Sequence, residues 1–160
     1  MFKQAIQVIT TAVVLTVIAA VSVWAQQPWL VPSLGSSALV QIMMPRVPAA
    51  RPWNAAVGQI SGVAGGFFAV YLAGAAGTPS FMDHHDLVLA RVLAVAIGIA
   101  LTAGMQALFK ALNPAGAATV LVVVLGAETA TWAGAGRLLF GIFLVTLLGE
   151  AARWLMLKLP

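Results

Sequence analysis

Cysteine is absent from this chain of 160 residues. Its absence excludes disulfide bonds, thiolate nucleophiles and metal sites built from cysteine. The apolar segments also lack a Ser-His-acid set, a pair of carboxylates and the spacing of metal ligands. We therefore expect that the protein is not an enzyme and carries no cofactor and no metal ion.

Charged side chains are scarce as well. The chain has 8 Lys and Arg and 4 Asp and Glu, so 8% of its residues are charged, whereas 62% are hydrophobic and the mean hydropathy is +1.03. A soluble domain carries about 25% charged residues because its surface faces water. The apolar surface of this chain must face a lipid bilayer instead. The net charge of +4 comes from scattered cations rather than a basic patch, which excludes nucleic-acid binding.

Long apolar segments make up most of the chain. A helix of about 20 apolar residues spans roughly 30 Å, the thickness of the hydrocarbon core. Four segments are this long: Ala5–Ala25, Asn54–Gly77, Leu87–Ala111 and Arg137–Leu157. Two shorter segments, Ser33–Met44 and Ala115–Ala130, follow Pro32 and Pro114, which favour helix starts, and are interpreted as broken or half-length helices. We predict an all-α integral membrane protein with about six membrane segments in a single transmembrane domain, residues 1–160.

The first apolar segment has two interpretations. Lys3, the apolar run, and Val23-Trp24-Ala25 before Gln26 resemble a cleaved signal peptide. However, a run of about 20 residues exceeds the usual 7–15 of a signal core and is long enough to cross the membrane. The segment also has a counterpart in the second half of the chain. We favour a retained transmembrane segment.

The order long, short, long occurs twice. Shifting the first half by 81 positions places Ser33 to Ala38 on Pro114 to Thr119, and Gly35 then falls on Gly116. The first of the six segments lands on the fourth. The individual residues match weakly, so the interpretation depends on the pattern of segment lengths. We predict two repeats, about residues 5–77 and 87–158.

Charge indicates how the segments cross. If all six cross and the N-terminus is cytoplasmic, six basic residues lie inside and two outside. The inside group is Lys3, Arg46, Arg51, Lys110, Arg153 and Lys158, and the outside pair is Arg91 and Arg137. If the short segments re-enter without crossing, the cations divide four and four. The positive-inside rule favours six crossings with both termini in the cytoplasm, as in a bacterial cytoplasmic membrane protein. Three crossings per repeat, an odd number, make the two repeats inverted, as in many secondary transporters.

Small residues form stripes on two of the long segments. Gly58, Gly62 and Gly66 recur every four residues, and Ala94 and Gly98 repeat the spacing in a later segment. Such stripes let helix backbones approach closely in lipid, where no hydrophobic force joins the helices. They predict a compact helix bundle and say little about a substrate.

The starts of the short helices are the candidate substrate-binding site. The first four N–H groups of a helix lack intrahelical partners, and together with the helix dipole they attract anions. The small and polar residues at the two starts are Ser33, Gly35, Ser36, Ser37, Asn113, Pro114, Gly116, Ala117 and Thr119. The alternative is that these small residues only allow tight helix contacts.

A few polar residues stand alone in the apolar sequence. Gln59 lies beside the glycine stripe and either serves a solute or bonds a neighbouring helix. Glu150 and Arg153 are three positions apart on one helix and are expected to pair. Arg46 and Arg51 flank a proline-rich loop, where they either orient the chain or draw anions to a cytoplasmic mouth.

His84 and His85 stand between two aspartates, Asp83 and Asp86. A metal-binding or pH-sensing role is one interpretation, because histidine titrates near neutrality. We favour the other, a solvated turn that also caps the next helix.

Three motifs in order resemble the HPP family of membrane proteins. They are Pro32-Ser33-Leu34-Gly35-Ser36-Ser37-Ala38, then Pro45-Arg46-Val47-Pro48-Ala49-Ala50-Arg51-Pro52-Trp53-Asn54, then Leu112-Asn113-Pro114-Ala115-Gly116-Ala117. The resemblance covers about residues 28–150. It implies a transport role, since some members in cyanobacteria and plastids are implicated in nitrite transport, and it adds Asn54 to the candidate substrate-binding residues.

The chain departs from the family pattern in two motifs. The His-Pro-Pro of the family appears as Leu112-Asn113-Pro114. Where many members have Pro-Arg-Asn followed by Gly-His, this chain has Pro52-Trp53-Asn54 followed by Gly58-Gln59. Two histidines and an arginine are thus replaced by neutral or apolar groups. We therefore expect backbone N–H groups, and not titrating side chains, to bind the solute.

We predict a transporter or channel for a small inorganic anion such as nitrite. Two alternatives stay open. One is a membrane subunit that does not transport and packs on a partner through its glycine stripes. The other is a path for a neutral solute such as urea, which the lack of intramembrane charge favours nearly as well. A homo-oligomer is compatible with so short a chain.

Overall fold

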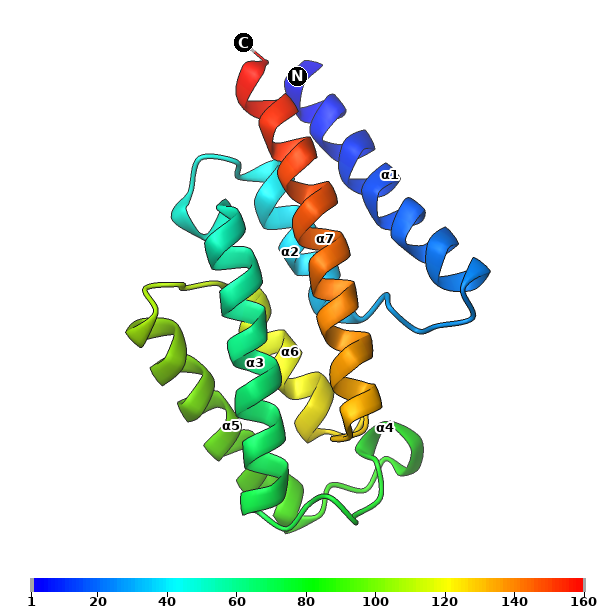
Figure 1. Cartoon of the computed structure of the whole chain (residues 1–160), viewed down its shortest axis with the longest axis vertical. Helices are drawn as coiled ribbons and strands as arrows, with labels where there is room; N and C mark the ends of the chain where they lie inside the picture. Colours follow the sequence, from blue (N-terminus) through cyan, green and yellow to red (C-terminus); the bar gives the residue numbers. More distant parts are fainter. Residues whose placement is uncertain (1, 160) are drawn as a thin grey trace.

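Helices make up the whole regular structure of residues 2–159, the part of the chain that the computed structural model describes. Six helices of eleven residues or more form the body of the molecule (Figure 1). They are α1 (Phe2–Trp24), α2 (Pro32–Met43), α3 (Pro52–Leu72), α5 (Leu89–Leu108), α6 (Pro114–Val124) and α7 (Trp132–Lys158). A single 3-10 turn, η1 (Pro48–Ala50), and a short helix, α4 (Phe81–His84), lie in the connections.

Four of these helices, α1, α3, α5 and α7, are long and apolar enough to cross a membrane. This confirms the predicted all-helical membrane protein and its four long segments. α2 and α6 are the two short helices, with 12 and 11 residues. Successive long and short helices run in alternating directions, and both termini lie at one end of the molecule (Figure 1). At that end the Nζ of Lys3 donates to the carbonyl of Leu159 at 2.8 Å.

Proline and caps set the helix starts. Pro32, Pro52 and Pro114 are the first residues of α2, α3 and α6, where the missing N–H of proline costs no hydrogen bond. α7 begins at Trp132 rather than at the predicted Arg137, because the hydroxyl of Thr131 accepts from the N–H of Gly134.

Helix ends differ from the predictions where glycine intervenes. α6 ends at Val124 rather than near Ala130, and Gly126 follows with a φ of 83°. This left-handed conformation suits glycine because it has no β-carbon. The predicted cap by the Asp83–Asp86 turn is wrong: residues 81–84 form α4, and α5 begins after Val88 without a side-chain cap.

The centre of the bundle is formed by α2, α3, α6 and α7. Each short helix contacts the other, and both contact α3 or α7. α1 packs on α2 and α7 at one flank, whereas α5 packs on α3 and α6 at the other (Figure 1). α3 is the most enclosed of the long helices, with 56% of its apolar stretch buried against 28% in α1 and in α5. The short helices therefore lie inside a layer of long ones.

Candidate functional site

Gln59 occupies the point where the two short helices meet α3. Its side chain is fully buried. Its Nε2 donates to the Oγ of Ser37 on α2 at 3.2 Å and to the carbonyl of Ala55 at 3.3 Å. Its Oε1 accepts from the Oγ1 of Thr119 on α6 at 3.5 Å. One carboxamide thus links the second turns of both short helices to α3, and the structure brings together three residues of the predicted site.

The buried face of α2 is polar along most of its length. Ser33, Ser37 and Gln41 follow one another at every fourth position, which puts them on the same side of the helix, and none of the three is exposed. The Oγ of Ser33 and both polar atoms of Gln41 have no hydrogen-bond partner within residues 2–159. The Oγ of Ser36 donates to the carbonyl of Ser33 at 2.9 Å. Buried polar atoms without partners are rare in proteins, so these positions need a physical explanation.

The start of α6 is organised differently. The Oδ1 of Asn113 accepts from the N–H of Ala115 at 2.8 Å, and its Nδ2 donates to the carbonyl of Ala49 at 3.0 Å. Asn113 is therefore the cap of its own helix. Asn54 donates to the carbonyl of Leu112 at 3.2 Å, so this predicted residue also holds the approach to α6. The polar side chains predicted here serve the backbone.

Gln106 was missed by the sequence analysis, although it lies in an apolar helix as Gln59 does. Its Nε2 donates to the carbonyl of Gly58 at 3.0 Å and to that of Asn113 at 3.1 Å. Its Oε1 accepts from the N–H of Asn113 at 3.1 Å. These bonds fasten the start of α6 to α3 and α5. The signal that could have found it is a glutamine among apolar residues, since such groups need partners in lipid.

The glycine stripe of α3 faces α6 within the same chain. A β-carbon on Gly62 would overlap the carbonyl of Gly116, and one on Gly116 would overlap the carbonyl of Gly58. A β-carbon on Gly66 would lie 2.9 Å from the Cβ of Val123. The backbones of α3 and α6 are thus in direct contact, as small-residue stripes allow.

Other predicted small residues lie away from this contact. A β-carbon on Gly35 would meet no atom within 4 Å, and Pro114 and Ala117 are exposed. On α5, a β-carbon on Gly98 would lie 2.8 Å from Val120, and Ala94 is fully buried. Gly35 therefore lacks the close backbone contact of Gly116, the residue on which the shift of 81 positions places it.

The outer ends of both short helices are bound by side chains from the flanking helices. Arg91 on α5 is 5% exposed, and its guanidinium donates to the carbonyls of Val124, Thr78 and Pro79 at 2.7–2.8 Å. Gln7 on α1 donates to the carbonyls of Ile42 and Met43 at 2.9 and 3.1 Å. Donors and cations stabilise the unpaired carbonyls of a helix C-terminus. From the sequence, Arg91 was expected only to report topology, and its contact with the end of α6 was not predicted.

Cations gather at the end of the molecule where the termini lie. Arg46 and Arg51 are exposed on the loop between α2 and α3. The predicted pair of Glu150 and Arg153 is confirmed, with 2.7 Å between Nε and Oε2. Arg153 also donates to the carbonyl of Pro45 at 3.0 Å, which ties α7 to the end of α2. This end is positively charged and lies directly beyond the polar face of α2.

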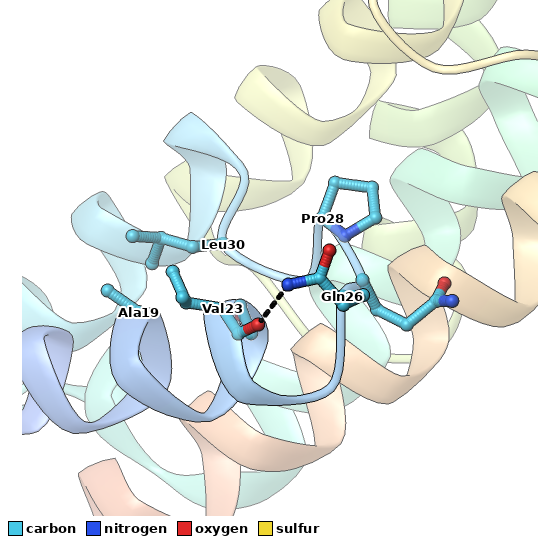
Figure 2. A pocket seen from close by; sticks show the side chains of 7 residues that line it. Ala19, Val23, Gln26, Pro28 and Leu30 are labelled. Carbon is cyan, nitrogen blue, oxygen red and sulfur yellow. Dashed lines mark hydrogen bonds between the residues drawn. The ribbon is translucent and has the colours of Figure 1, made fainter.

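A pocket of about 400 Å³ opens where α1 ends and the chain turns toward α2. Figure 2 shows its wall, which includes Val23, Gln26 and Leu30. The Nε2 of Gln26 donates to the carbonyl of Val23 at 3.0 Å. The lining is mostly apolar, and the pocket adjoins the loop that precedes Pro32.

Four long apolar helices around two short ones with buried polar side chains define a helical integral membrane protein. The family model described as HPP, transmembrane region, matches residues 1–158. The chain therefore belongs to the HPP transmembrane region family, as the resemblance of its motifs predicted. No curated protein and no solved structure matches the chain.

Proposed function

We propose that the chain is a transporter or channel for a small polar solute, with a small inorganic anion such as nitrite as the leading candidate. The single observation that supports it most is the set of buried polar atoms on α2. Ser33 and Gln41 have no partner in the described chain, although burying an unpaired polar group costs roughly 1–3 kcal/mol. A solute or water that reaches α2 would remove that cost.

The proposed passage follows α2 and passes Gln59. In this arrangement the solute enters from the end with Arg46 and Arg51, which attract anions electrostatically. Ser33, Ser36 and Ser37 then line the start of α2, where no side chain caps the helix. Because Asn113 already caps α6, we place the proposed binding site mainly on α2.

The proposed architecture is six crossings in two inverted repeats, α1 to α3 and α5 to α7. Exchanging the two sets of helices converts α1 with α7 into α5 with α3, and α2 with α7 into α6 with α3, and leaves α2 with α6 and α3 with α7 unchanged. Pro32 and Pro114 start the short helices 82 positions apart. The carbonyls bound by Gln7 and Arg91, those of Ile42 and Val124, are also 82 apart. These correspondences support a repeat with an offset one residue longer than the predicted 81.

Flux into vesicles tests the proposal. Purified protein in liposomes is expected to admit nitrite or formate faster than empty vesicles do. Ser33→Ala is expected to lower that flux roughly tenfold, the effect of losing one hydrogen bond of about 1.5 kcal/mol to a charged solute.

The matched control is Ser22→Ala on α1, because the Oγ of Ser22 bonds only the carbonyl of Ile18 in its own helix. This variant is expected to keep the flux of the parent. Flux of nitrite, formate and nitrate equal to that of empty vesicles would rule out the anion transporter.

The alternative of a neutral, urea-like solute is favoured by one observation: Gln59, Ser37 and Thr119 at the crossing carry no charge. Uptake of urea without any uptake of nitrite would establish it. The alternative of a subunit that docks through its glycine stripe has less support, because Gly58, Gly62 and Gly66 face α6 of the same chain. A homo-oligomer remains a proposal.

A further inference from the structure

Gln41 is the one buried glutamine in residues 2–159 whose side chain lacks any partner. Gln7, Gln59 and Gln106 are also buried, and each bonds a carbonyl or a hydroxyl. Gln41 is 0% exposed, and neither its Nε2 nor its Oε1 has a partner in the described chain. Gln41 was not among the residues predicted from the sequence, although a glutamine in the apolar run Leu39-Val40-Gln41-Ile42 is the same signal that could have found Gln106.

A glycine on the facing helix leaves room for the side chain of Gln41. Its carboxamide lies against Gly149 of α7, where a β-carbon would overlap both the oxygen and the carbon of the amide group. Thr146, one turn earlier on α7, also has a buried hydroxyl without a partner in the part of the chain that the structure describes. Two helices thus present unpaired polar atoms at neighbouring turns. Water or a solute would supply the donors and acceptors that these atoms lack.

The buried face of α2 itself carries no charged side chain, and Arg46 and Arg51 are exposed on the loop beyond its end. The nearest charged residues along α7 are Glu150 and Arg153, and they pair with each other at 2.7 Å. The buried Arg91 is on the far side of the bundle, where its guanidinium bonds three carbonyls. An anion without a counter-charge is strongly disfavoured in a medium of low dielectric constant. A helix N-terminus offers the equivalent of only about half a charge and acts within one turn, whereas Gln41 lies two turns beyond Ser33.

The polar face also has a direction. From Gln59 toward the end with the termini, α2 offers Ser37 and Gln41. From Gln59 toward the opposite end, α2 adds Ser33, whereas α6 offers Val120, Val123 and Val124, which are fully or almost fully buried. Water that enters this crossing therefore finds hydrogen-bonding groups along α2 and an apolar wall on α6 beyond Thr119.

We infer that the face of α2 from Ser33 to Gln41 is a water-lined binding station, and that the solute it holds is neutral and carries both a hydrogen-bond donor and an acceptor. The carboxamide of Gln41 donates through Nε2 and accepts through Oε1, and the hydroxyls of Ser33 and Ser37 do both. An amide such as urea has this chemistry, and so has the conjugate acid of a weak-acid anion. The inference about the solute rests on the proposed transport role and favours its neutral, urea-like alternative or a protonated acid over the anion itself. The hydration of Gln41 does not depend on that role.

Alkylation of a single cysteine tests the station without any flux measurement. The parent chain has no cysteine, so Gln41→Cys supplies the only thiol. Iodoacetamide is neutral and carries an amide, whereas iodoacetate is an anion of nearly the same size. In both reactions the thiolate displaces iodide and a thioether forms. Detergent-solubilised protein gives both reagents access to both ends of the molecule.

Two matched variants calibrate the rates. Ile42→Cys lies next to Gln41, is 0% exposed and leaves a comparable space in apolar surroundings. Gln27→Cys lies in the exposed loop after α1 and gives the ratio of the two reagents in water. We expect iodoacetamide to modify Gln41→Cys roughly tenfold faster than Ile42→Cys. We also expect the ratio of the iodoacetate rate to the iodoacetamide rate to be about ten times lower at Gln41→Cys than at Gln27→Cys.

Each other result overturns part of the inference. Equal iodoacetamide rates at Gln41→Cys and Ile42→Cys would show that the station is dry. An iodoacetate ratio at Gln41→Cys equal to that at Gln27→Cys would show that it accepts anions. Protection of Ser37→Cys from iodoacetamide distinguishes an amide from a protonated weak acid as the solute. Urea should slow the alkylation at every pH, whereas formate should slow it only as the pH is lowered. Protection by neither would overturn the solute half. A failure of vesicle flux refutes the proposed function and leaves the alkylation result standing.

Discussion

A polar side chain inside a membrane has to find partners, and the buried glutamines of this chain do so in different ways. Gln7 bonds carbonyls at the end of α2, and Gln106 bonds carbonyls of α3 and of the residue before α6. Gln59 bonds the hydroxyls of two helices at once. Gln41 bonds nothing in the described chain. Residue type alone could not tell these roles apart, because the sequence contains the amide but not the groups around it.

Replacing Gln106 and replacing Gln41 are expected to have different effects on stability. Gln106→Leu is expected to lower the free energy of unfolding by about 2–3 kcal/mol, because the buried N–H of Asn113 loses its acceptor and the carbonyls of Gly58 and Asn113 lose a shared donor. Gln41→Leu is expected to stay within about 0.5 kcal/mol of the parent or to exceed it, because no protein partner is lost. Unfolding of purified protein in mixed detergent micelles measures both. An equal loss in the two variants would show that Gln41 has structural partners after all.

The elements were largely predictable where prolines mark their starts. Pro32 and Pro114 placed the starts of both short helices correctly, and the apolar lengths gave all four long ones. The misplaced boundaries at Thr131 and Gly126 depend on local hydrogen bonds and backbone angles that apolar patterning does not encode. The site was partly predictable for a similar reason. Serines and glycines indicated where helices approach closely, but only the packing shows which of them face the crossing.

The contact between α3 and α6 predicts a sharp difference between two glycines. Gly62→Ala is expected to lower the free energy of unfolding by about 1–3 kcal/mol, because its β-carbon would overlap the carbonyl of Gly116. Gly35→Ala, in open space on α2, is expected to be neutral or to gain up to about 1 kcal/mol of helix propensity. Unfolding in detergent micelles compares the pair. An unchanged free energy of unfolding in Gly62→Ala would mean that α3 and α6 are not in backbone contact.

The whole molecule combines two sets of three helices whose short members meet in the centre (Figure 1). Alternating directions and neighbouring termini agree with the six crossings that we propose from the charge distribution. The exchange of contacts between the two sets was not visible in the sequence, where the matched residues are mostly different. Gln7 and Arg91, for example, bind corresponding carbonyls with unrelated side chains.

Side-specific labelling tests the six crossings. In sealed vesicles of one orientation, an impermeant maleimide is expected to reach Gln4→Cys and Arg46→Cys from the same side, and Asp86→Cys from the other. All three positions are exposed, and the parent has no cysteine to react. If the short segments re-enter instead, Gln4→Cys and Asp86→Cys will share a side and Arg46→Cys will be opposite. The charge argument for six crossings would then be wrong.

The central claim is that the polar crossing around Gln59 is the passage for the solute. Vesicle flux through Gln59→Leu tests it most directly, with Ile60→Leu, the neighbouring exposed residue, as the control for a change of side chain on α3. Gln59→Leu is expected to lose flux by roughly tenfold or more, because an apolar side chain replaces the carboxamide that bonds both short helices. Ile60→Leu should transport as the parent does. Undiminished flux of nitrite, formate or urea through folded Gln59→Leu would contradict the claim and place the passage elsewhere in the molecule.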